Sequence, residues 1–481
     1  MNRQTRNRKF FTFLGPLQGP KTLVLHTMGY LVQNGGLGMA GDLIITGGRP
    51  LQGRVEIPAA KNSVLPLLAA ALLCSGPVRL RRVPRLTDVE DCLTLLRAAG
   101  CTALWQGADV VVQGTPHTAR LEKTAAGRMR ASILFCAPLL ARLGRAETVL
   151  PGGCRIGARP IDLHLQGLAQ MGVHQLPAEE GKLVLYAPAG LHGAEICLAF
   201  PSVGATETLL LAAACAQGQT LLHNAAREPE IADLAAFLNR CGGCVEGAGT
   251  DTIRVQGRRV LGGCSFAPVA DRITASTLAC ACAAAGGRVE LAGCAPQLYA
   301  PLLETLAQMG CTVERERGAA AVSRFGRLRG AGAVCTGVYP ALATDAAPLL
   351  AAAMLCADGP GSIEDRVFEH RFACAEGFAA FGADVRVEGR TLHVQPGKAL
   401  HGAHVTAPDL RGGAALAVAA LAARGRSRIG GVELIERGYA DFAPMLASLG
   451  AQIRQEMPPA GAADKKTPAK KQICLAIGAK R

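Results

Sequence analysis

Aromatic side chains are scarce in this sequence, which has one tryptophan and five tyrosines among 481 residues. Proteins that bind single-stranded nucleic acids stack bases on such rings, so few stacking platforms are available. Long apolar runs are also missing. The best, such as residues 65–74, stop near ten residues, whereas a membrane-spanning helix needs about 18 or more. The sequence therefore predicts no membrane span, and its abundance of alanine predicts cores of tightly packed aliphatic helices.

Acidic residues are fewer than basic ones, and the resulting net charge of +14 is concentrated in the tails. Residues 1–38 carry +5 and residues 455–481 carry +4, which leaves +5 for the rest of the chain. Basic tails are usually solvated extensions. We therefore expect a disordered N-terminal extension over residues 1–40, a basic C-terminal tail over residues 456–481 and no nucleic-acid partner. The alternative is strong, salt-dependent nucleic-acid binding through the tails.

Disulfides are not expected, although the chain has 18 cysteines. Most of them lie in apolar stretches such as residues 278–283, where a free cysteine acts as a small buried hydrophobic side chain in a reducing compartment. The one CxxC motif, at residues 241–244, has no second pair or histidine cluster at zinc spacing, and we interpret it as a helix terminus. These observations predict a cytoplasmic protein without a metal site.

A sixfold repeat organises most of the chain. A helix-like segment that ends in glycine and is followed by a β-prone run recurs with spacings of 72, 70, 68, 72 and 68 residues. Glycine directly after a helix is typical of a left-handed backbone position. Most copies also hold an earlier helix that is apolar nearly all round, which other elements must enclose. Units of this size usually build closed domains, so we predict two domains of three repeats. The repeat glycines are Gly100, Gly172, Gly242, Gly310, Gly382 and Gly450.

Residues 151–164 differ in composition from their surroundings. Three glycines and two prolines in fourteen residues predict a sharply turning loop, and Cys154 lies within it. Arg155 and Arg159 flank this cysteine, and nearby positive charge lowers the pKa of a thiol. Cys154 is therefore a candidate reactive residue, and the alternative is that it serves only as a small side chain.

Together with eight further motifs in the same order, this loop resembles the UDP-N-acetylglucosamine enolpyruvyl transferases over residues 41–455. The further motifs are residues 60–62, 129–133, 201–206, 226–231, 344–345, 367–372, 409–411 and 436–439. The resemblance implies a two-domain inside-out α/β barrel of six repeats, with the active site in the interdomain cleft. It places residues 41–60 and 270–455 in one domain and residues 61–269 in the other.

The resemblance also implies transfer of the enolpyruvyl group of phosphoenolpyruvate to the 3′-hydroxyl of UDP-N-acetylglucosamine, the first committed step of peptidoglycan precursor synthesis, without a cofactor. The phosphate and carboxylate of phosphoenolpyruvate require fixed cations, and arginine contacts both groups with two parallel hydrogen bonds. Each cation taken alone would instead be interpreted as part of a surface salt bridge. The phosphoenolpyruvate residues implied are Lys61, Asn62, Arg159, Arg371, Arg411 and Arg437.

Two residues take catalytic roles by resemblance. Cys154 is expected to deliver a proton to C3 of the enolpyruvyl group, and Asp345 is expected to act as the base near the sugar hydroxyl. An aspartate after threonine is also a common helix cap, which is the alternative for Asp345. The residues implied for UDP-N-acetylglucosamine are Arg130, Arg159, Pro160, Ile161, Asp162, Leu163, Ser202, Val203, Gly204, Asp345 and Val367.

Three positions depart from the family pattern. Ala59 stands where glycine is usual, Thr274 where glutamate is usual, and Ala347 where glutamine is usual. Every charged group assigned to the chemistry is nevertheless present, so we expect activity on a diverged scaffold. Two alternatives remain, namely the sister family that uses shikimate 3-phosphate as acceptor and an inactive paralogue that binds the sugar nucleotide.

Overall fold

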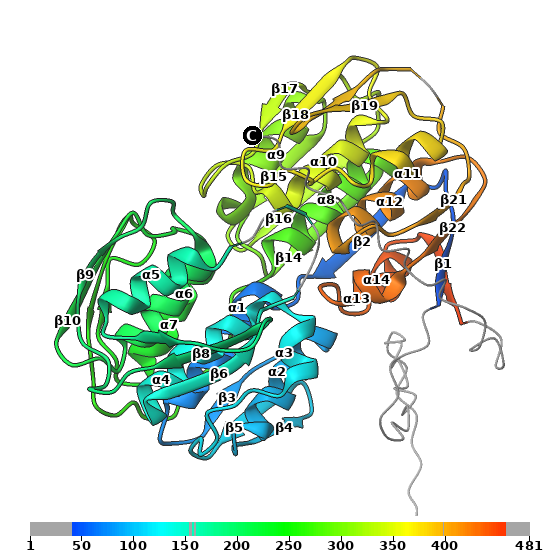
Figure 1. Ribbon diagram of the computed structural model, residues 1–481. Coiled ribbons are helices and arrows are strands. Elements are labelled where there is room, and N and C mark those ends of the chain that lie inside the picture. The colour runs from blue at the N-terminus through cyan, green and yellow to red at the C-terminus, as the bar shows by residue number, and fades with distance from the viewer. Residues whose placement is uncertain (1–40, 153–155, 158–159, 398, 458–481) are drawn as a thin grey trace, which may run out of the picture. The chain divides into compact units, whose positions relative to one another are not determined.

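The computed structural model describes residues 41–152, 156–157, 160–397 and 399–457 (Figure 1). The predictions made for residues 1–40, for Cys154 and Arg159, and for the C-terminal tail beyond residue 457 lie outside these residues. Within them, no helix combines the length and apolar character that a membrane span requires.

Two separate hydrophobic cores organise the described residues. The first core is built by residues 64–261, and the second core by residues 43–57 together with residues 273–451. The N-terminal segment belongs to the second core because β2 (Leu51–Glu56) pairs in parallel with β14 (Gly287–Ala292). Parallel pairing of strands so far apart in sequence ties the beginning of the described chain to its second half.

Three sheets belong to the first core. The strand order of one sheet is β13 (Ser265–Phe266), β3 (Val78–Leu80), β5 (Asp109–Gln113) and β4 (Thr102–Gln106). That of another is β11 (Val245–Glu246), β12 (Thr252–Gln256), β10 (Gln219–His223) and β9 (Glu195–Cys197). The three-stranded sheet has the order β6 (Arg145–Val149), β8 (Lys182–Tyr186) and β7 (His174–Leu176). The inner helices of this core are α1 (Lys61–Ala70), α4 (Cys136–Leu143) and α6 (Val203–Ala213). The other helices are α2 (Thr87–Ala98), α3 (Lys123–Arg128), α5 (Asp162–Gln170) and α7 (Pro229–Arg240).

The second core has three four-stranded sheets. Their strand orders are β21 (His404–Thr406), β22 (Arg426–Gly430), β1 (Asp42–Thr46), β23 (Gln452–Glu456); β15 (Thr312–Glu316), β16 (Ala319–Arg324), β14, β2; and β17 (Gly332–Cys335), β18 (Gly361–Glu364), β20 (Thr391–Val394), β19 (Val385–Glu388). The inner helices are α8 (Arg272–Ala285), α10 (Ala347–Met354) and α12 (Leu410–Ala422). The other helices are α9 (Ala300–Gln308), α11 (Ala375–Ala380), α13 (Val432–Glu436) and α14 (Phe442–Ser448).

The six sheets follow the six predicted repeats. Each repeat glycine comes just after a helix, namely α2, α5, α7, α9, α11 or α14, and has a positive φ between 88° and 104°. A strand begins within three residues of every one of them. The predicted left-handed glycines are thus confirmed, and so is the CxxC at residues 241–244 as a helix terminus, because Cys241 caps α7.

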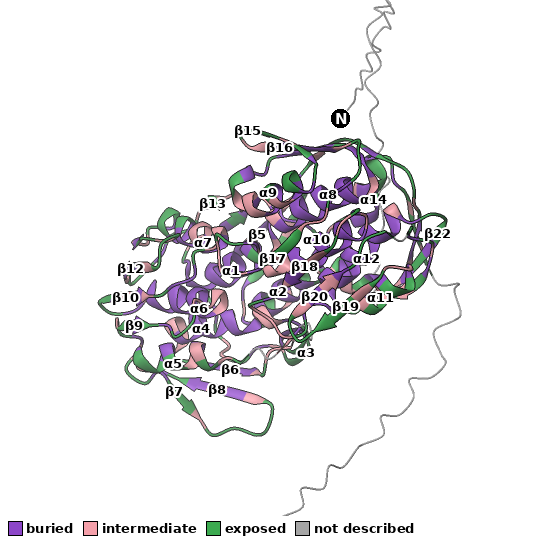
Figure 2. Ribbon diagram, turned by 90° about the horizontal axis from the view of Figure 1, so that it is seen from above, coloured by how far each residue is buried: buried purple, intermediate pink, exposed green. Residues whose placement is uncertain are grey.

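Small apolar side chains explain why the inner helices are enclosed. All residues of α10 are buried, and so are all but the terminal ones of α8 and α12. These three helices contact one another, and alanine permits such close approach because it has little volume to pack. Figure 2 shows buried helices inside, with strands of mixed burial around them, as the prediction of apolar helices enclosed by other elements requires.

Candidate active site

A cavity of about 760 Å³ is lined by residues from both cores. The first turns of α1, α6, α8 and α12 line it, as do two 3₁₀ turns that lead into α4 and α10, η2 (Arg130–Phe135) and η4 (Thr344–Ala346). The beginnings of the six inner helices named above therefore face one cavity. Helix N-termini present unpaired backbone N–H groups and the positive end of the helix dipole. The repeat architecture thus creates a site suited to anions.

Four of the cations predicted from the sequence line this cavity, and we call Lys61, Arg371, Arg411 and Arg437 the cationic cluster. Arg371 and Arg411 are only 2% exposed, so interpreting them as surface salt bridges is wrong. Nη1 of Arg411 is buried and has no hydrogen-bond partner among the described residues. Because a buried N–H without a partner is destabilising, this atom indicates where a ligand's oxygen would bind.

Asp345 joins two members of the cationic cluster. Its Oδ1 lies 3.0 Å from Nη2 of Arg371 and its Oδ2 lies 3.1 Å from Nε of Arg411. The side chain makes no capping hydrogen bond at η4 or α10, so the helix-cap alternative is wrong. Burial acts to raise the pKa of Asp345, but the charges of Arg411 and Arg371 outweigh it and hold the pKa well below its usual range.

Asp365, which the sequence analysis did not identify, organises the segment that carries Arg371. Its Oδ2 accepts a hydrogen bond of 2.6 Å from Thr344, whose hydroxyl in turn accepts one of 2.9 Å from Nε of Arg371. The other oxygen of Asp365 accepts bonds from the backbone N–H groups of Val367 and Phe368. This buried carboxylate therefore fixes the turn that brings Val367 and Phe368 to the cavity.

Lys61 and Arg437 are joined by a second aspartate that the sequence analysis missed. Nζ of Lys61 lies 3.3 Å from Oδ2 of Asp88, and Nε of Arg437 lies 2.9 Å from Oδ1. Burial acts to raise the pKa of Asp88, but Lys61 and Arg437 lower it below its usual value. Asp88 is in the first turn of α2 and is separated from Arg437 by 349 residues, so no local motif could have identified the contact.

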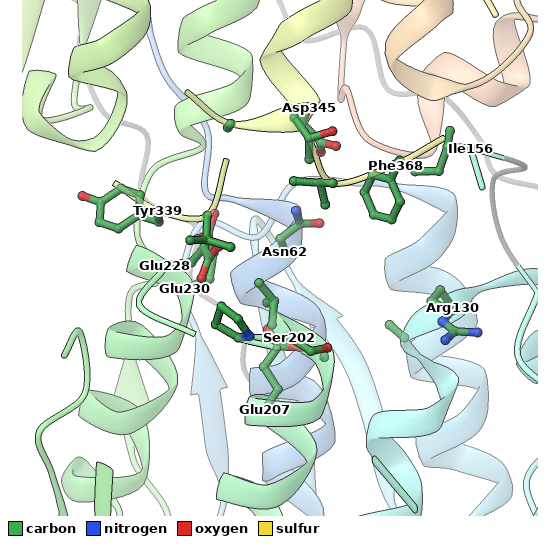
Figure 3. Close-up of a pocket in the computed structure, with 18 of the residues that line it drawn as sticks. Asn62, Arg130, Ile156, Ser202, Glu207, Glu228, Glu230, Tyr339, Asp345 and Phe368 are labelled. Carbon is green, nitrogen blue, oxygen red and sulfur yellow. The ribbon is translucent and has the colours of Figure 1, made fainter. Parts of the chain in front are cut away.

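Three glutamates line another part of the cavity, and we call Glu207, Glu228 and Glu230 the carboxyl cluster (Figure 3). Arg272 donates two hydrogen bonds, of 3.1 and 3.4 Å, to Glu230. Burial, followed by repulsion from Glu230 and Glu228, raises the pKa of Glu207 well above its usual value. Burial also raises the pKa of Glu228, although the backbone of Tyr339 hydrogen-bonds to it. The sequence motif at residues 226–231 contained Glu228 and Glu230, but no role had been assigned to them or to Arg272.

Among the described residues, those predicted for the sugar nucleotide line the same cavity, with Ile161 as the exception, and Arg159 lies outside the described residues. Nη2 of Arg130 donates a 2.8 Å hydrogen bond to the carbonyl of Pro160, which joins Arg130 to the segment just before α5. Ser202 caps α6 by accepting a hydrogen bond from the N–H of Ala205. Ile161 precedes α5 and packs against the first core instead of lining the cavity. The lining residues among those predicted for the sugar nucleotide are Arg130, Pro160, Asp162, Leu163, Ser202, Val203, Gly204, Asp345 and Val367, and Asn62, predicted for phosphoenolpyruvate, lines the cavity as well.

The segment that follows Cys154 reaches the cavity at Ile156, the nearest described residue after it that lines the wall. The carbonyl of Ile156 accepts a 3.0 Å hydrogen bond from the N–H of His370. This hydrogen bond joins Ile156, which lies in the part of the chain that builds the first core, to the segment of the second core that carries Arg371.

The three departures from the family pattern lie away from the cavity surface, since none of them is among its lining residues. Thr274 is buried and donates a 3.1 Å hydrogen bond to Asp271, the cap of α8. Ala347 is the fully buried first residue of α10. Ala59 forms an isolated bridge with Ala270. These substitutions therefore alter the scaffold and leave the cationic cluster in place.

Comparison with known sequences gives consistent matches over most of the chain. The profile of the EPSP synthase (3-phosphoshikimate 1-carboxyvinyltransferase) family matches residues 45–446. The UDP-N-acetylglucosamine 1-carboxyvinyltransferase of Nitratidesulfovibrio vulgaris is 42% identical over 415 residues, which cover 86% of this chain and 99% of the relative. The protein of the same name from Solibacter usitatus is 43% identical over 420 residues, with the same coverage of both chains.

Solved structures give the same picture for the fold. The enolpyruvyl transferase NikO from Streptomyces tendae superimposes with a TM-score of 0.78 at 27% sequence identity, over 88% of this chain and all of NikO. An EPSP synthase from Acinetobacter baumannii superimposes with a TM-score of 0.68 at 20% identity, over 86% of this chain and all of that protein. The latter likeness concerns the fold alone.

Proposed function

Because the chain belongs to the EPSP synthase family of enolpyruvyl transferases, we propose that it transfers the enolpyruvyl group of phosphoenolpyruvate to the 3′-hydroxyl of UDP-N-acetylglucosamine and releases phosphate. The predicted six-repeat α/β fold of this family is confirmed by the solved structures. The observation that carries the proposal is the cationic cluster around Asp345, which sets cations for a phosphate and a carboxylate beside a base for a hydroxyl. The names of the relatives support this acceptor and a role in peptidoglycan precursor synthesis. A cytoplasmic location is part of the proposal.

The two hydrophobic cores support a division into two domains, residues 41–60 with 270–455 and residues 61–269. The substrates then bind between them, since both cores contribute lining residues. Phosphoenolpyruvate binds to the cationic cluster together with Asn62 and Arg159, and its oxygens satisfy the unpaired Nη1 of Arg411. The sugar nucleotide lies along Arg130, residues 159–163, residues 202–204 and Val367.

Phosphoenolpyruvate binding activates Asp345 as a base. In the absence of ligand, Arg371 and Arg411 hold the pKa of Asp345 too low for it to take a hydroxyl proton. When the anionic groups of phosphoenolpyruvate take over contacts with these arginines, their stabilisation of the carboxylate weakens and its pKa rises. Asp345 then accepts the proton of the 3′-hydroxyl as that oxygen attacks.

The chemistry proceeds by addition and then elimination. The 3′-oxygen forms a bond to C2 of phosphoenolpyruvate, and C3 receives a proton from the thiol of Cys154, which gives a tetrahedral ketal. C3 then returns a proton to the thiolate of Cys154, the double bond forms again, and the C2–O bond breaks so that phosphate leaves with the bonding electron pair. The position of Ile156 in the cavity wall, two residues after Cys154, supports this role for the thiol.

The test is phosphate release from phosphoenolpyruvate with and without UDP-N-acetylglucosamine, for the parent and for Cys154→Ser. We expect release that requires the sugar nucleotide and falls strongly in the variant. Release with shikimate 3-phosphate alone would assign the sister activity. Sugar-nucleotide binding without any release, even at high enzyme concentration, would identify an inactive paralogue.

Fosfomycin gives an independent test of the thiol. If Cys154 is a reactive group in an anion site, this epoxide alkylates it, which peptide mass spectrometry detects. Cys154→Asp is expected to retain some turnover and to escape the inhibitor, because a carboxyl group can still donate the proton. Full parental activity after prolonged exposure would show that Cys154 is not the reactive acid.

A further inference from the structure

The arrangement of Lys61 and Arg437 raises a question about how two cations are kept at one point of the cavity. Lys61 is the first residue of α1, where the positive end of the helix dipole opposes a cation. Arg437 follows α13 of the second core and faces the same place. Two positive side chains at one place in a cavity repel each other, and an anion between them offsets this repulsion.

Asp88 is that anion. It is only 3% exposed and contacts Lys61 through Oδ2 and Arg437 through both carboxylate oxygens, at 2.9 Å to Nε and 3.5 Å to Nη2. The paired contact along one edge of the guanidinium fixes the plane of Arg437. Its place in the first turn of α2 also favours a negative charge.

We propose that Asp88 is a positioning residue for phosphoenolpyruvate, which holds Lys61 of the first core and Arg437 of the second core in one orientation for the substrate phosphate. This inference rests on the proposed function. Asp88 acts through the two cations and takes no proton from either substrate. It is therefore the counterpart of Asp345, which holds the other two members of the cationic cluster but also reacts.

The test is the kinetics of Asp88→Asn, which keeps the side-chain shape and removes the charge. We expect the KM for phosphoenolpyruvate to rise about tenfold to hundredfold, as when a hydrogen bond to a charged group is lost. The KM for UDP-N-acetylglucosamine should stay within about twofold of the parent value. In a double-mutant cycle with Arg437→Ala, the effects should be less than additive, because contacting residues share their interaction.

A matched control is available on the same helix. Asp91 is also 3% exposed and pairs with the side chain of Arg128, but it does not line the cavity. Asp91→Asn should lower thermal stability to a similar extent as Asp88→Asn while leaving the KM for phosphoenolpyruvate unchanged. Equal rises of that KM in both variants would overturn the proposal and assign Asp88 a purely structural role.

Failure of this inference can be told apart from failure of the proposed function. A parent enzyme that releases no phosphate would refute the function. An active parent with an unchanged KM in Asp88→Asn would refute only the role of Asp88. If Asp88→Asn does not fold, Asp88→Glu retains the charge at a longer reach and should fold with a raised KM for phosphoenolpyruvate; an unchanged KM in that variant would equally refute the role.

Discussion

The cationic cluster and the carboxyl cluster line the same cavity, but the pKa values of the carboxyl groups in these two places are shifted in opposite directions. In the cationic cluster, Asp88 and Asp345 each hold two cations, and their pKa values are lowered. In the carboxyl cluster, Arg272 forms an ion pair with Glu230, and the pKa values of Glu207 and Glu228 are raised. Carboxyl groups in one part of the cavity therefore have lowered pKa values, and carboxyl groups in the other part have raised ones. Neighbouring charges decide the direction of the shift, since burial alone acts to raise the pKa of all four groups.

The largest expected effect on activity comes from replacing the carboxylate of Asp345 by an amide. Asp345→Asn should lower kcat by about 10² to 10⁴-fold, because the base for the 3′-hydroxyl is lost. Steady-state phosphate release measures it, and retained sugar-nucleotide binding shows that the fold is intact. Activity within about twofold of the parent would exclude Asp345 as the base.

A smaller effect is expected when the charge is kept and its geometry is changed. Arg411→Lys should lower kcat/KM for phosphoenolpyruvate by about tenfold to hundredfold, because lysine cannot form two parallel hydrogen bonds. Arg272→Lys, the matched change in the carboxyl cluster, should lower the melting temperature and leave kcat/KM for phosphoenolpyruvate close to the parent value. Equal kinetic losses in both variants would remove the distinction between the clusters.

The carboxyl groups in the two clusters should also change the stability of the protein with pH in opposite directions. The lowered pKa values of Asp88 and Asp345 give stability that is present above the unfolded value near 4 and is lost as pH falls below it. The raised pKa of Glu207 has the opposite effect. Its contribution to stability is present below the unfolded pKa and is lost as pH rises through the folded pKa. Glu207→Gln should therefore melt about 2 °C above the parent near pH 8 and together with it near pH 4. Thermal unfolding across this pH range checks the prediction, and parallel curves for both proteins would contradict it.

The smallest effect is expected for the activity of the same variant. Glu207→Gln replaces a carboxyl group whose uncharged form is already favoured, because burial raises its pKa well above the usual value, so phosphate release should change by less than about twofold. The change is of the same type as Asp345→Asn, a carboxyl group replaced by its amide, and is made in the same cavity. A large loss of activity would show that Glu207 works as an anion and that the two clusters are alike.

Much of the fold could be predicted from the sequence because each repeat carries its own local signals. Glycines such as Gly100 and Gly450 end helices in a conformation that other residues rarely adopt, so their spacing alone gave the repeat. Apolar helices such as residues 272–285 had to be enclosed whatever their neighbours were. Cations such as Arg371 and Arg411 were identified only through the resemblance of their motifs to a known family.

The sequence by itself determined the six repeats with their helices and strands, and its motifs identified the four members of the cationic cluster through their resemblance to a known family. Only the tertiary structure decided that the inner helices begin at one cavity, that Asp88 joins Lys61 to Arg437, and that the pKa of Glu207 is raised while that of Asp345 is lowered. The reason is physical. Helix ends and turns depend on a few neighbouring residues, whereas a pKa or an ion pair depends on burial and on charges brought together from segments hundreds of residues apart.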